Sequence, residues 1–458
     1  MKTSKLSLLI CIYSFSILCG QTSIDEFLNL SKQLVRRSLE DRKGYYWLKE
    51  LCEIGPRLVA SSNSYNAIEW ARKNMIKSGF DSVWLQPVRV PVWIRGDREE
   101  CQIIKSKEYS GKKLNITALG GSIGTGDNGV SGRVVVVHDF MELYTKRDKV
   151  KGNFVFFNRS LDFGEVETFS AYGKAVDQRI YGAIEAAKYG AAGVIVRSIT
   201  TKHDNTPHTG ILRYNDSIPR IPAVVIGNLD ADFLVNAIKV EPNLELYIKL
   251  SCKSLDDTIS YNVIGEIRGC ELPNEVVLVG GHIDSWDKGC GAHDNGTGVI
   301  HSMEALDLIK RLNFNPKRTI RCVLFMGEEF NSIGGIEYNN YAQSTEQIHI
   351  AAIESDRGGF TPRGFSVEAD SNIILDLQKF LPYLSLAKID WIRKGGSGAD
   401  ISRLKNVKAK IGFVPDNQRY MDVHHSDNDI FEEVHPRELQ LGSAAIAILA
   451  LLISQFGL

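Results

Sequence analysis

Apolar and polar residues follow a strand–helix rhythm over the C-terminal part of the chain. From about residue 258, short apolar runs alternate with longer stretches in which apolar residues recur every three or four positions. Strands are expected at 261–267, 275–282, 320–327 and 348–355, and helices near 297–312, 333–345, 372–382 and 436–456. This alternation predicts an α/β domain with a mainly parallel sheet covered by helices.

The pattern before residue 258 is more varied. A helical pattern covers about 46–80, and a strand pattern follows at 83–94. A glycine-rich stretch at 120–132 then opens a region with elements of its own. Its strands are expected at 133–140, 153–158, 192–198 and 221–227, and its helix at 181–190. These elements predict a separate β/α module over about 111–250.

Both ends of the chain carry apolar segments that must be distinguished from membrane spans. Residues 1–20 have a basic start, a short apolar stretch and a small final residue, a pattern typical of a cleaved secretory signal. In the polar segment 21–45, Arg36-Arg37 leaves two interpretations open, a removed propeptide or an N-terminal helix. The last predicted helix is continuously apolar only over 444–453, short of the ~20 residues that a span requires. We therefore expect a secreted or lumenal protein without a membrane span in the mature chain.

Composition agrees with a globular protein that has a substantial core. The chain has 458 residues, of which 43% are apolar and 24% charged, and its formal net charge is −1. This balance gives no support to a nucleic-acid partner, which would require a strongly basic face. Six cysteines follow the predicted signal, an even number compatible with disulfides whose pairing the sequence does not reveal. Glycosylation sequons, which fit the same compartment, occur at Asn29, Asn115, Asn158 and Asn215.

Polar residues suited to metal binding stand at the ends of the predicted strands. Strand 275–282 ends on His282, and Asp284 follows on the same side of an extended chain, where its carboxylate can orient a metal-binding ring. The next strand leads to Glu328 and Glu329, which point to opposite sides, so that one can bind metal while the other faces water. Because strand ends meet at one edge of an open α/β sheet, we expect these side chains to converge.

Other candidates lie in loops. Asp294 stands in a glycine-rich loop before a predicted helix, Asp356 follows strand 348–355, and His424 and His425 lie in a polar segment. Each feature alone is more often structural, because a strand-end histidine is usually hydrogen-bonded and a glycine-rich loop is usually a turn. Their joint order at strand ends and loops predicts a metal site.

Four motifs carry a resemblance to a known family. The sequences GGHIDSWDKGCGAHDNGTG, MGEEFNSIGG, ESDRGG and HHSDND, in this order, resemble the di-zinc aminopeptidase and glutamate carboxypeptidase family. The similarity runs from GPRLVASSN at 55–63 to the C terminus. It implies a di-zinc exopeptidase fold in two parts, 46–110 and 251–458, with a protease-associated-like module at 111–250. It also implies a homodimer that hydrolyses short peptides, in particular dipeptides with free termini.

Carried over residue by residue, the resemblance implies two Zn²⁺ ions per subunit that share Asp294. The remaining ligands would be His282 and Asp356 for one ion, and Glu329 and His425 for the other. Three protein ligands per ion leave a position open for water, which is the pattern of a catalytic zinc site.

The resemblance also assigns the residues of the reaction. Glu328 is expected to be the general base, and Asp284, which orients His282, is also counted among the catalytic residues. His425 is preferred to His424 as the ligand because only His425 precedes an acid, Asp429, at the spacing of the family motif. His424 is expected to line the pocket.

Several residues near these motifs are open to more than one interpretation. Arg357, Lys394 and Asp400 are candidates for substrate contact, although solvated loop charges are the simpler alternative. Arg357 stands where a small residue is more familiar in the family. His293 precedes Asp294 and is expected to line the site.

Competing chemistries have weaker support. Ser122 lies in a nucleophile-elbow pattern, and 124–129 match a dinucleotide fingerprint, but both patterns require a following helix and the sequence continues as loop and strand. Cys290 is more simply a buried or disulfide-bonded residue than a nucleophile. A non-catalytic receptor or binding protein on the same scaffold, and an aminopeptidase acting on longer peptides, remain as alternatives.

Overall fold

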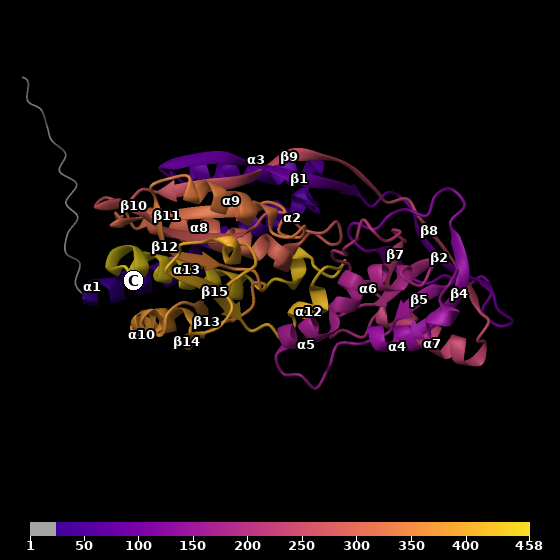
Figure 1. Cartoon of the computed structure of the whole chain (residues 1–458). Coiled ribbons are helices and arrows are strands. Elements are labelled where there is room, and N and C mark those ends of the chain that lie inside the picture. Colours follow the sequence, from indigo (N-terminus) through magenta and orange to yellow (C-terminus); the bar gives the residue numbers. More distant parts are fainter. Residues whose placement is uncertain (1–23) are drawn as a thin grey trace, which may run out of the picture.

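The computed structural model describes residues 24–458, so the predicted signal peptide lies outside the described residues. Figure 1 shows two bodies, a larger one that holds the N-terminal helices and the C terminus, and a smaller one drawn mostly in magenta. Each body is built around its own sheet, of eight strands in the larger and seven in the smaller.

The larger sheet is parallel at its centre and mixed at its edges. In spatial order its strands are β1 (Ser82–Ile94), β9 (Lys253–Ile267), β11 (Arg318–Phe325), β10 (Leu272–His282), β12 (Ile348–Glu354), β15 (Ala409–Pro415), β13 (Pro362–Glu368) and β14 (Trp391–Lys394). The central strands β11, β10, β12 and β15 run parallel, whereas β1–β9, β9–β11 and β13–β15 are antiparallel pairs. The predicted α/β class with a mainly parallel sheet is confirmed.

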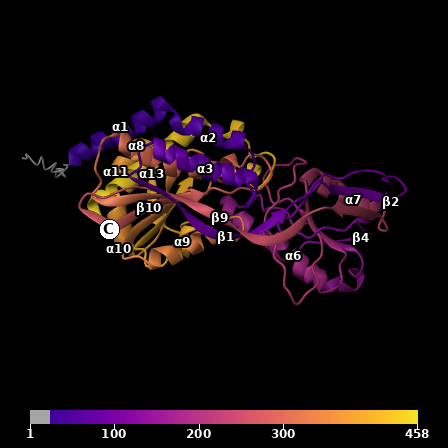
Figure 2. The ribbon, with the colours of Figure 1, turned by 90° about the horizontal axis from the view of Figure 1, so that it is seen from above.

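Helices cover both faces of this sheet because its central strands are apolar on both sides. In β10, Val277 and Val279 belong to the core beneath the helices α8 and α13, whereas Leu278 packs on the other face with Tyr338 of α9. Figure 2 shows α1, α2 and α3 on one side of the sheet and α9 on the other. The helices are α1 (Ile24–Asp41), α2 (Lys43–Ile54), α3 (Ser62–Lys77), α8 (Thr297–Arg311), α9 (Ile333–Gln343), α10 (Ser371–Gln378), α11 (Leu381–Leu384), α12 (Tyr420–Val423) and α13 (Pro436–Phe456).

The two terminal helices pack against each other. Phe27 and Leu34 of α1 are fully buried, and the Ser38 hydroxyl donates to the main-chain oxygen of Gln440 in α13. The described part of 21–45 thus forms α1 and the start of α2 and packs on the larger body. Within residues 24–458, α13 alone is long and apolar enough to cross a membrane, and most of it is buried inside the protein, as in a core helix.

Several predicted boundaries differ from those of the structure. The single helical segment expected over 46–80 is two helices, because Gly55 adopts a positive φ of 92° and Pro56 follows it, so the chain leaves the helix there. The helix expected at 372–382 likewise divides into α10 and α11. The strands β15, β13 and β14 were not predicted; β14, at the edge of the sheet, has only four residues, too few for a clear pattern.

The smaller body is an insertion between β1 and β9. These two strands pair with Ile94 opposite Lys253, so the chain leaves and re-enters the larger sheet at one point. The module therefore spans about 95–252, whereas 111–250 was predicted, because β2 pairs with β8 inside the module. Its sheet has the order β2 (Glu99–Lys105), β8 (Glu245–Leu250), β4 (Val130–Val137), β5 (Phe154–Phe157), β6 (Gly193–Arg197), β7 (Ala223–Ile226) and β3 (Ile116–Ala118).

The module carries the helices α4 (Phe140–Thr145), α5 (Thr168–Ala175), α6 (Asp177–Ala187) and α7 (Asn228–Val240). An apolar cluster joins it to the larger body near α12. There Ala171 and Ala175 of α5 pack with Phe360, Tyr420 and Met421 of the larger body. Buried apolar contacts therefore connect the module to the larger body at this junction.

Five of the six cysteines that follow the predicted signal carry free thiols in the structure. These are Cys52, Cys101, Cys252, Cys290 and Cys322. Cys101 and Cys322 are buried in different bodies, on β2 and β11, which prevents them from pairing. Burial raises the pKa of Cys101 to about 12. For these five residues, the expectation of disulfide bonds is not met.

Candidate metal centre

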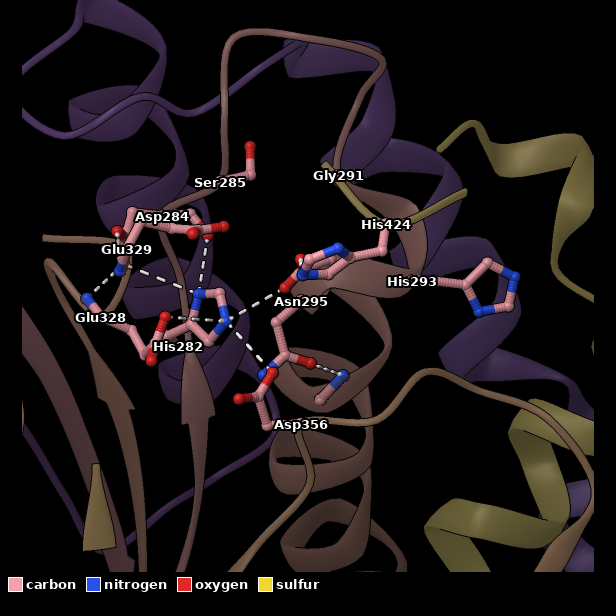
Figure 3. A network of polar contacts seen from close by, with 12 residues as sticks. His282, Asp284, Ser285, Gly291, His293, Asn295, Glu328, Glu329, Asp356 and His424 are labelled. Atoms are coloured by element: carbon pink, nitrogen blue, oxygen red, sulfur yellow. Dashed lines mark hydrogen bonds and ion pairs between the residues drawn. The ribbon is translucent and has the colours of Figure 1, made fainter. Parts of the chain in front are cut away.

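The predicted strand ends meet at one edge of the larger sheet. His282 is the last residue of β10, Asp356 follows β12, and Glu328 and Glu329 follow β11. The Nε2 atom of His282 lies 3.2 Å from Oδ1 of Asp356 and 3.9 Å from Oε2 of Glu328. Figure 3 shows these side chains turned toward one another around the His282 ring. The parallel arrangement of β11, β10 and β12 produces this convergence.

Asp294 lies between two histidines that come from different parts of the chain. Its Oδ1 is 3.3 Å from Nε2 of His282, and its Oδ2 is 3.2 Å from Nε2 of His425. The same His425 nitrogen is 3.1 Å from Oε2 of Glu329. Asp294 therefore faces His282 and Asp356 with one oxygen, and His425 and Glu329 with the other.

The loop that carries Asp294 is fixed by hydrogen bonds to its backbone. The carboxylate of Asp429 accepts from the amides of His293, at 2.7 Å, and Asp294, at 3.0 Å. Asn295 donates to the main-chain oxygen of Ser355, and the peptide bond between Asp294 and Asn295 is cis. Desolvation raises the pKa of the Asp429 carboxyl to about 7.

Asp284 occupies the position expected for it but acts through two different groups. Nδ1 of His282 donates to the main-chain oxygen of Asp284 at 3.0 Å, whereas the nearer carboxylate oxygen is 3.7 Å away. That carboxylate accepts from the amides of Gly327, Glu328 and Glu329. The backbone of Asp284 thus orients the histidine, and its side chain holds the turn that presents the two glutamates.

Glu328 and Glu329 differ in their surroundings, as adjacent residues of an extended segment do. Oε2 of Glu329 accepts from the indole nitrogen of Trp286 at 2.5 Å. The carboxylate of Glu328 makes no hydrogen bond within residues 24–458, and its side chain is 19% exposed. Burial is the main cause that raises the pKa of Glu328 well above its ordinary value. Glu328 therefore has a free carboxylate at the edge of the site.

His424 and His425 stack with ring centroids 3.5 Å apart, yet they are not equivalent. Nε2 of His424 is 3.8 Å from Oδ2 of Asp294, farther than that of His425. His425 has a positive φ of 59°, which turns its ring toward Glu329. Its Nδ1 donates at 3.2 Å to the main-chain oxygen of Thr209, a residue of the inserted module.

The remaining candidates from the sequence lie in different environments. Arg357 is half-buried beside Asp356, its guanidinium 5.2 Å from the centre of the Phe169 ring. Asp400 is fully buried and Lys394 is exposed on β14. Asp400 therefore lacks a surface that a substrate can reach in this structure.

His293 points away from the site, as Figure 3 shows. Its ring stacks on Phe360 with centroids 4.2 Å apart. Its Nδ1 accepts from the amide of Gly359, and its Nε2 donates to the main-chain oxygen of Glu433. The expectation that His293 lines the site is wrong, because these contacts fix its ring on the opposite side of the loop.

Sequence reasoning missed the residues that support the site from outside. Arg57 is fully buried and donates to the main-chain oxygens of Ile283, Cys290 and Gly291, so it clamps the loop before Asp294. Arg179 of α6 lies 3.4 Å from Nδ1 of His425. The motifs GPR at 55–57 and PHTG at 207–210 were visible, but nothing in their local pattern connects them with a metal site.

The charges of the site fit a bound cation. The carboxylates of Asp294 and Glu329 are buried beside His282 and His425, and those of Glu328 and Asp356 lie next to them, partly exposed. Oδ2 of Asp294 and Oε1 of Glu329 are buried without a hydrogen-bond partner in the described part of the chain. Buried charges of one sign require compensation, and oxygen and imidazole ligands suit zinc. Possible ligand atoms lie within 4.8 Å of one another in three groups, which are His282, Asp294 and Asp356; His282, Glu328 and Glu329; and Asp294, His424 and His425.

The competing motifs do not form sites. Ser122 is fully buried, its hydroxyl donates to the main-chain oxygen of Ile123, and the chain continues from it as loop into β4. A nucleophile elbow requires an exposed serine followed by a helix. The glycines at 124–129 lead into the same strand, which excludes a dinucleotide-binding turn.

Comparison with known proteins gives one consistent result. Residues 262–450 match the family model of peptidase family M28. Carboxypeptidase Q from Bos taurus is 33% identical over 402 residues, which cover 88% of this chain and 83% of that protein. A crystal structure of a peptidase M28 precursor from Shewanella amazonensis has a TM-score of 0.89 and 30% identity, and covers 95% of this chain and 98% of that one.

A zinc aminopeptidase from Bacillus subtilis shares the fold, with a TM-score of 0.65 at 20% identity, and covers 90% of this chain and 94% of that one. The relatives are similar over both bodies, and the family model covers the strands and loops that form the site. The resemblance found in the motifs is thereby confirmed, and the chain belongs to peptidase family M28, a family of zinc-dependent peptidases.

Proposed function

We propose that the protein is a di-zinc exopeptidase that hydrolyses short peptides, in particular dipeptides with free termini, as a carboxypeptidase Q-like enzyme. The observation that carries the proposal is the position of Asp294, whose two oxygens face two separate sets of ligands. His282, Asp294 and Asp356 would hold one ion, and Asp294, Glu329 and His425 the other. A non-catalytic binding protein would not require all five ligands together with the base Glu328.

The donor set determines what the bound metal contributes. When bound, zinc supplies Lewis-acid polarisation of the scissile carbonyl and of the attacking water. Trp286 holds Glu329 by a hydrogen bond, and Thr209 fixes the proton of His425 on Nδ1, which leaves Nε2 free to bind metal. The main-chain oxygen of Asp284 does the same for His282.

Glu328 is suited to move protons. Its carboxylate is free of hydrogen bonds within the described residues and lies beside His282, on the side of the cluster that remains partly exposed. There it can accept the proton of the attacking water and deliver that proton to the leaving amine. Such a positioned base contributes typically ~10²–10⁴-fold to the rate.

The space next to the ligands suits a short substrate. A cavity of about 380 Å³ borders Asp356 and is lined by Phe169, Phe413 and the turn at 396–399. This volume lies at the lower end of the range for small-molecule sites, ~300–1,000 Å³. It accommodates a single residue of a peptide more readily than an extended chain.

A panel of dipeptides with free and blocked ends, assayed with and without a chelator, tests the proposal. We expect hydrolysis of free dipeptides that disappears with the chelator and returns with Zn²⁺. Zinc-free protein without chelator-sensitive activity would instead support a binding protein. Preferential release of the first residue from long peptides would support an aminopeptidase.

We also propose a secreted or lumenal glycoprotein that forms a homodimer. The predicted sequons Asn29, Asn115 and Asn215 are exposed, and Asn158 is half-buried. The sequon at Asn295 lies inside the metal loop and is fully buried, so we expect it to be unmodified. Peptide mass spectrometry before and after deglycosylation, together with light scattering, tests these points.

A further inference from the structure

We propose that Arg357 binds the free α-carboxylate of the substrate, so that the enzyme recognises dipeptides from their carboxyl end. The inference rests on the proposed function and names the terminus that is anchored. Arg357 follows Asp356 directly, and both residues line the cavity of about 380 Å³. The positive charge of Arg357 therefore lies in the wall of the cavity that would hold the leaving residue of the substrate.

The guanidinium of Arg357 has unused donors. Within residues 24–458 it makes no hydrogen bond and no ion pair. It lies 5.2 Å from the centre of the Phe169 ring and within the electrostatic influence of Asp356 and Glu354. Phe169 belongs to α5, so the module supplies the ring beside which this guanidinium lies. Stacking on an aromatic face leaves the edge of a guanidinium free to bind a carboxylate with two parallel hydrogen bonds.

The buried arginines of the protein, in contrast, have partners within the chain. Arg57 donates to three main-chain oxygens, and Arg321 pairs with Glu266 at 2.7 Å. Arg95 pairs with both Asp287 and Glu99. Arg357 differs from them because no group within residues 24–458 hydrogen-bonds or ion-pairs with its guanidinium, as expected for a residue that binds a ligand.

The three acids that line the same cavity each have other contacts. Glu354 accepts from the amide of Ile401 at 2.7 Å, and Asp356 lies 3.2 Å from Nε2 of His282. Glu368, which also lines the cavity, lies 3.5 Å from the amine of Lys410. A substrate carboxylate would thus meet Arg357 without displacing an existing ion pair.

Peptide chemistry places a carboxylate at this point. In a dipeptide, the α-carboxylate is attached to the same carbon as the leaving amine, only a few bonds from the scissile carbonyl. A cation adjacent in sequence to a proposed metal ligand fits this short separation.

The test compares dipeptides that end in a free carboxylate with their C-terminal amides. Wild-type holoenzyme is expected to prefer the free acid, and Arg357→Met to lower kcat/KM for the acid by roughly 10- to 100-fold while changing the amide little. Arg357→Lys, which keeps the charge without the planar fork, should fall between the two. Arg393→Met is the matched control, because Arg393 also stacks on an aromatic ring, Trp391, but lies on exposed β14.

Binding provides a second measurement that does not depend on turnover. In a Glu328→Gln background, calorimetry of an intact dipeptide should show the same loss of affinity on Arg357→Met, with the zinc content unchanged. Equal preference for acid and amide in the wild type, or an unchanged preference in Arg357→Met, would overturn the inference while leaving the peptidase intact. Absence of any chelator-sensitive hydrolysis in the wild type would instead overturn the proposed function.

Discussion

The side chains that face the two carboxylate oxygens of Asp294 are positioned by different parts of the fold. On one side, His282 ends the central strand β10 and is held by the main chain two residues further along. On the other side, His425 follows the short helix α12, has a positive φ of 59°, and is held by Thr209 from the inserted module. We refer to these as the strand side and the loop side of the site.

The difference shows that the module is part of the active-site architecture. Gly210, which follows Thr209, has a φ of 136°, and a Cβ atom there would lie 2.8 Å from Nδ1 of His425 and 2.4 Å from Nη1 of Arg179. The loop side therefore depends on close contact between two bodies, whereas the strand side depends on one sheet. The following substitutions test this comparison.

Asp294→Ala should have the largest effect, because it removes the residue that both sides share. We expect loss of most bound zinc from both sides and a fall in kcat/KM beyond the ~10²–10⁴-fold attributable to a general base. Elemental analysis of the purified protein, together with dipeptide turnover, measures both. Full retention of two zinc ions by this variant would contradict the shared position.

Glu328→Gln should separate metal binding from proton transfer. Both sides should keep their zinc while kcat falls by ~10²–10⁴-fold, because the amide cannot accept the proton of water. The check combines zinc content with steady-state rates on one dipeptide. Turnover at the wild-type rate would remove Glu328 from the role of base.

His425→Ala should weaken the loop side alone. We expect zinc content to fall from two ions toward about one, since His282 and Asp356 still face Asp294. His424→Ala is the matched control, because the neighbouring ring lies 3.8 Å from Asp294 and should affect zinc less. A larger loss of zinc in His424→Ala would transfer the ligand role to that residue.

Gly210→Ala should have the smallest effect of the series, and it tests the module directly. The added carbon would press on His425 and Arg179, so we expect metal affinity on the loop side to fall by ~10–100-fold, as is typical for residues that support a ligand. Zinc titration against a competing chelator measures this change. The control is Gly173→Ala in α5, where a Cβ meets no atom within 4 Å. Equal affinities in the two variants would show that the module does not support the loop side.

Much of the strand side was predictable from sequence. An apolar run that ends on His282 or at Glu328 locates a strand end, and parallel strands bring such ends together. The loop side was predictable only in part. The choice between His424 and His425 rested on spacing from Asp429, and that spacing did not reveal that Asp429 holds the amides of His293 and Asp294.

Expectations that depended on long-range contacts were less accurate. His293 was placed in the site because it precedes Asp294, but it stacks on Phe360, which no local pattern indicates. The module boundary was placed too late because β2 is recognisable only by its pairing with β8, far along the chain. The role of Arg57 in holding the loop before Asp294 could not be predicted, since the carbonyls that it binds lie more than 200 positions away in the sequence.

The sequence by itself determined the α/β class, the strand-end positions of the polar residues and, through its motifs, the family. These follow from local periodicity and from residue types that a short segment contains. The tertiary structure decided which oxygen of Asp294 faces which histidine, how the module fixes His425, and that Arg357 lacks a partner within the described chain. Such facts depend on packing between segments that are distant in sequence, and no local pattern encodes them.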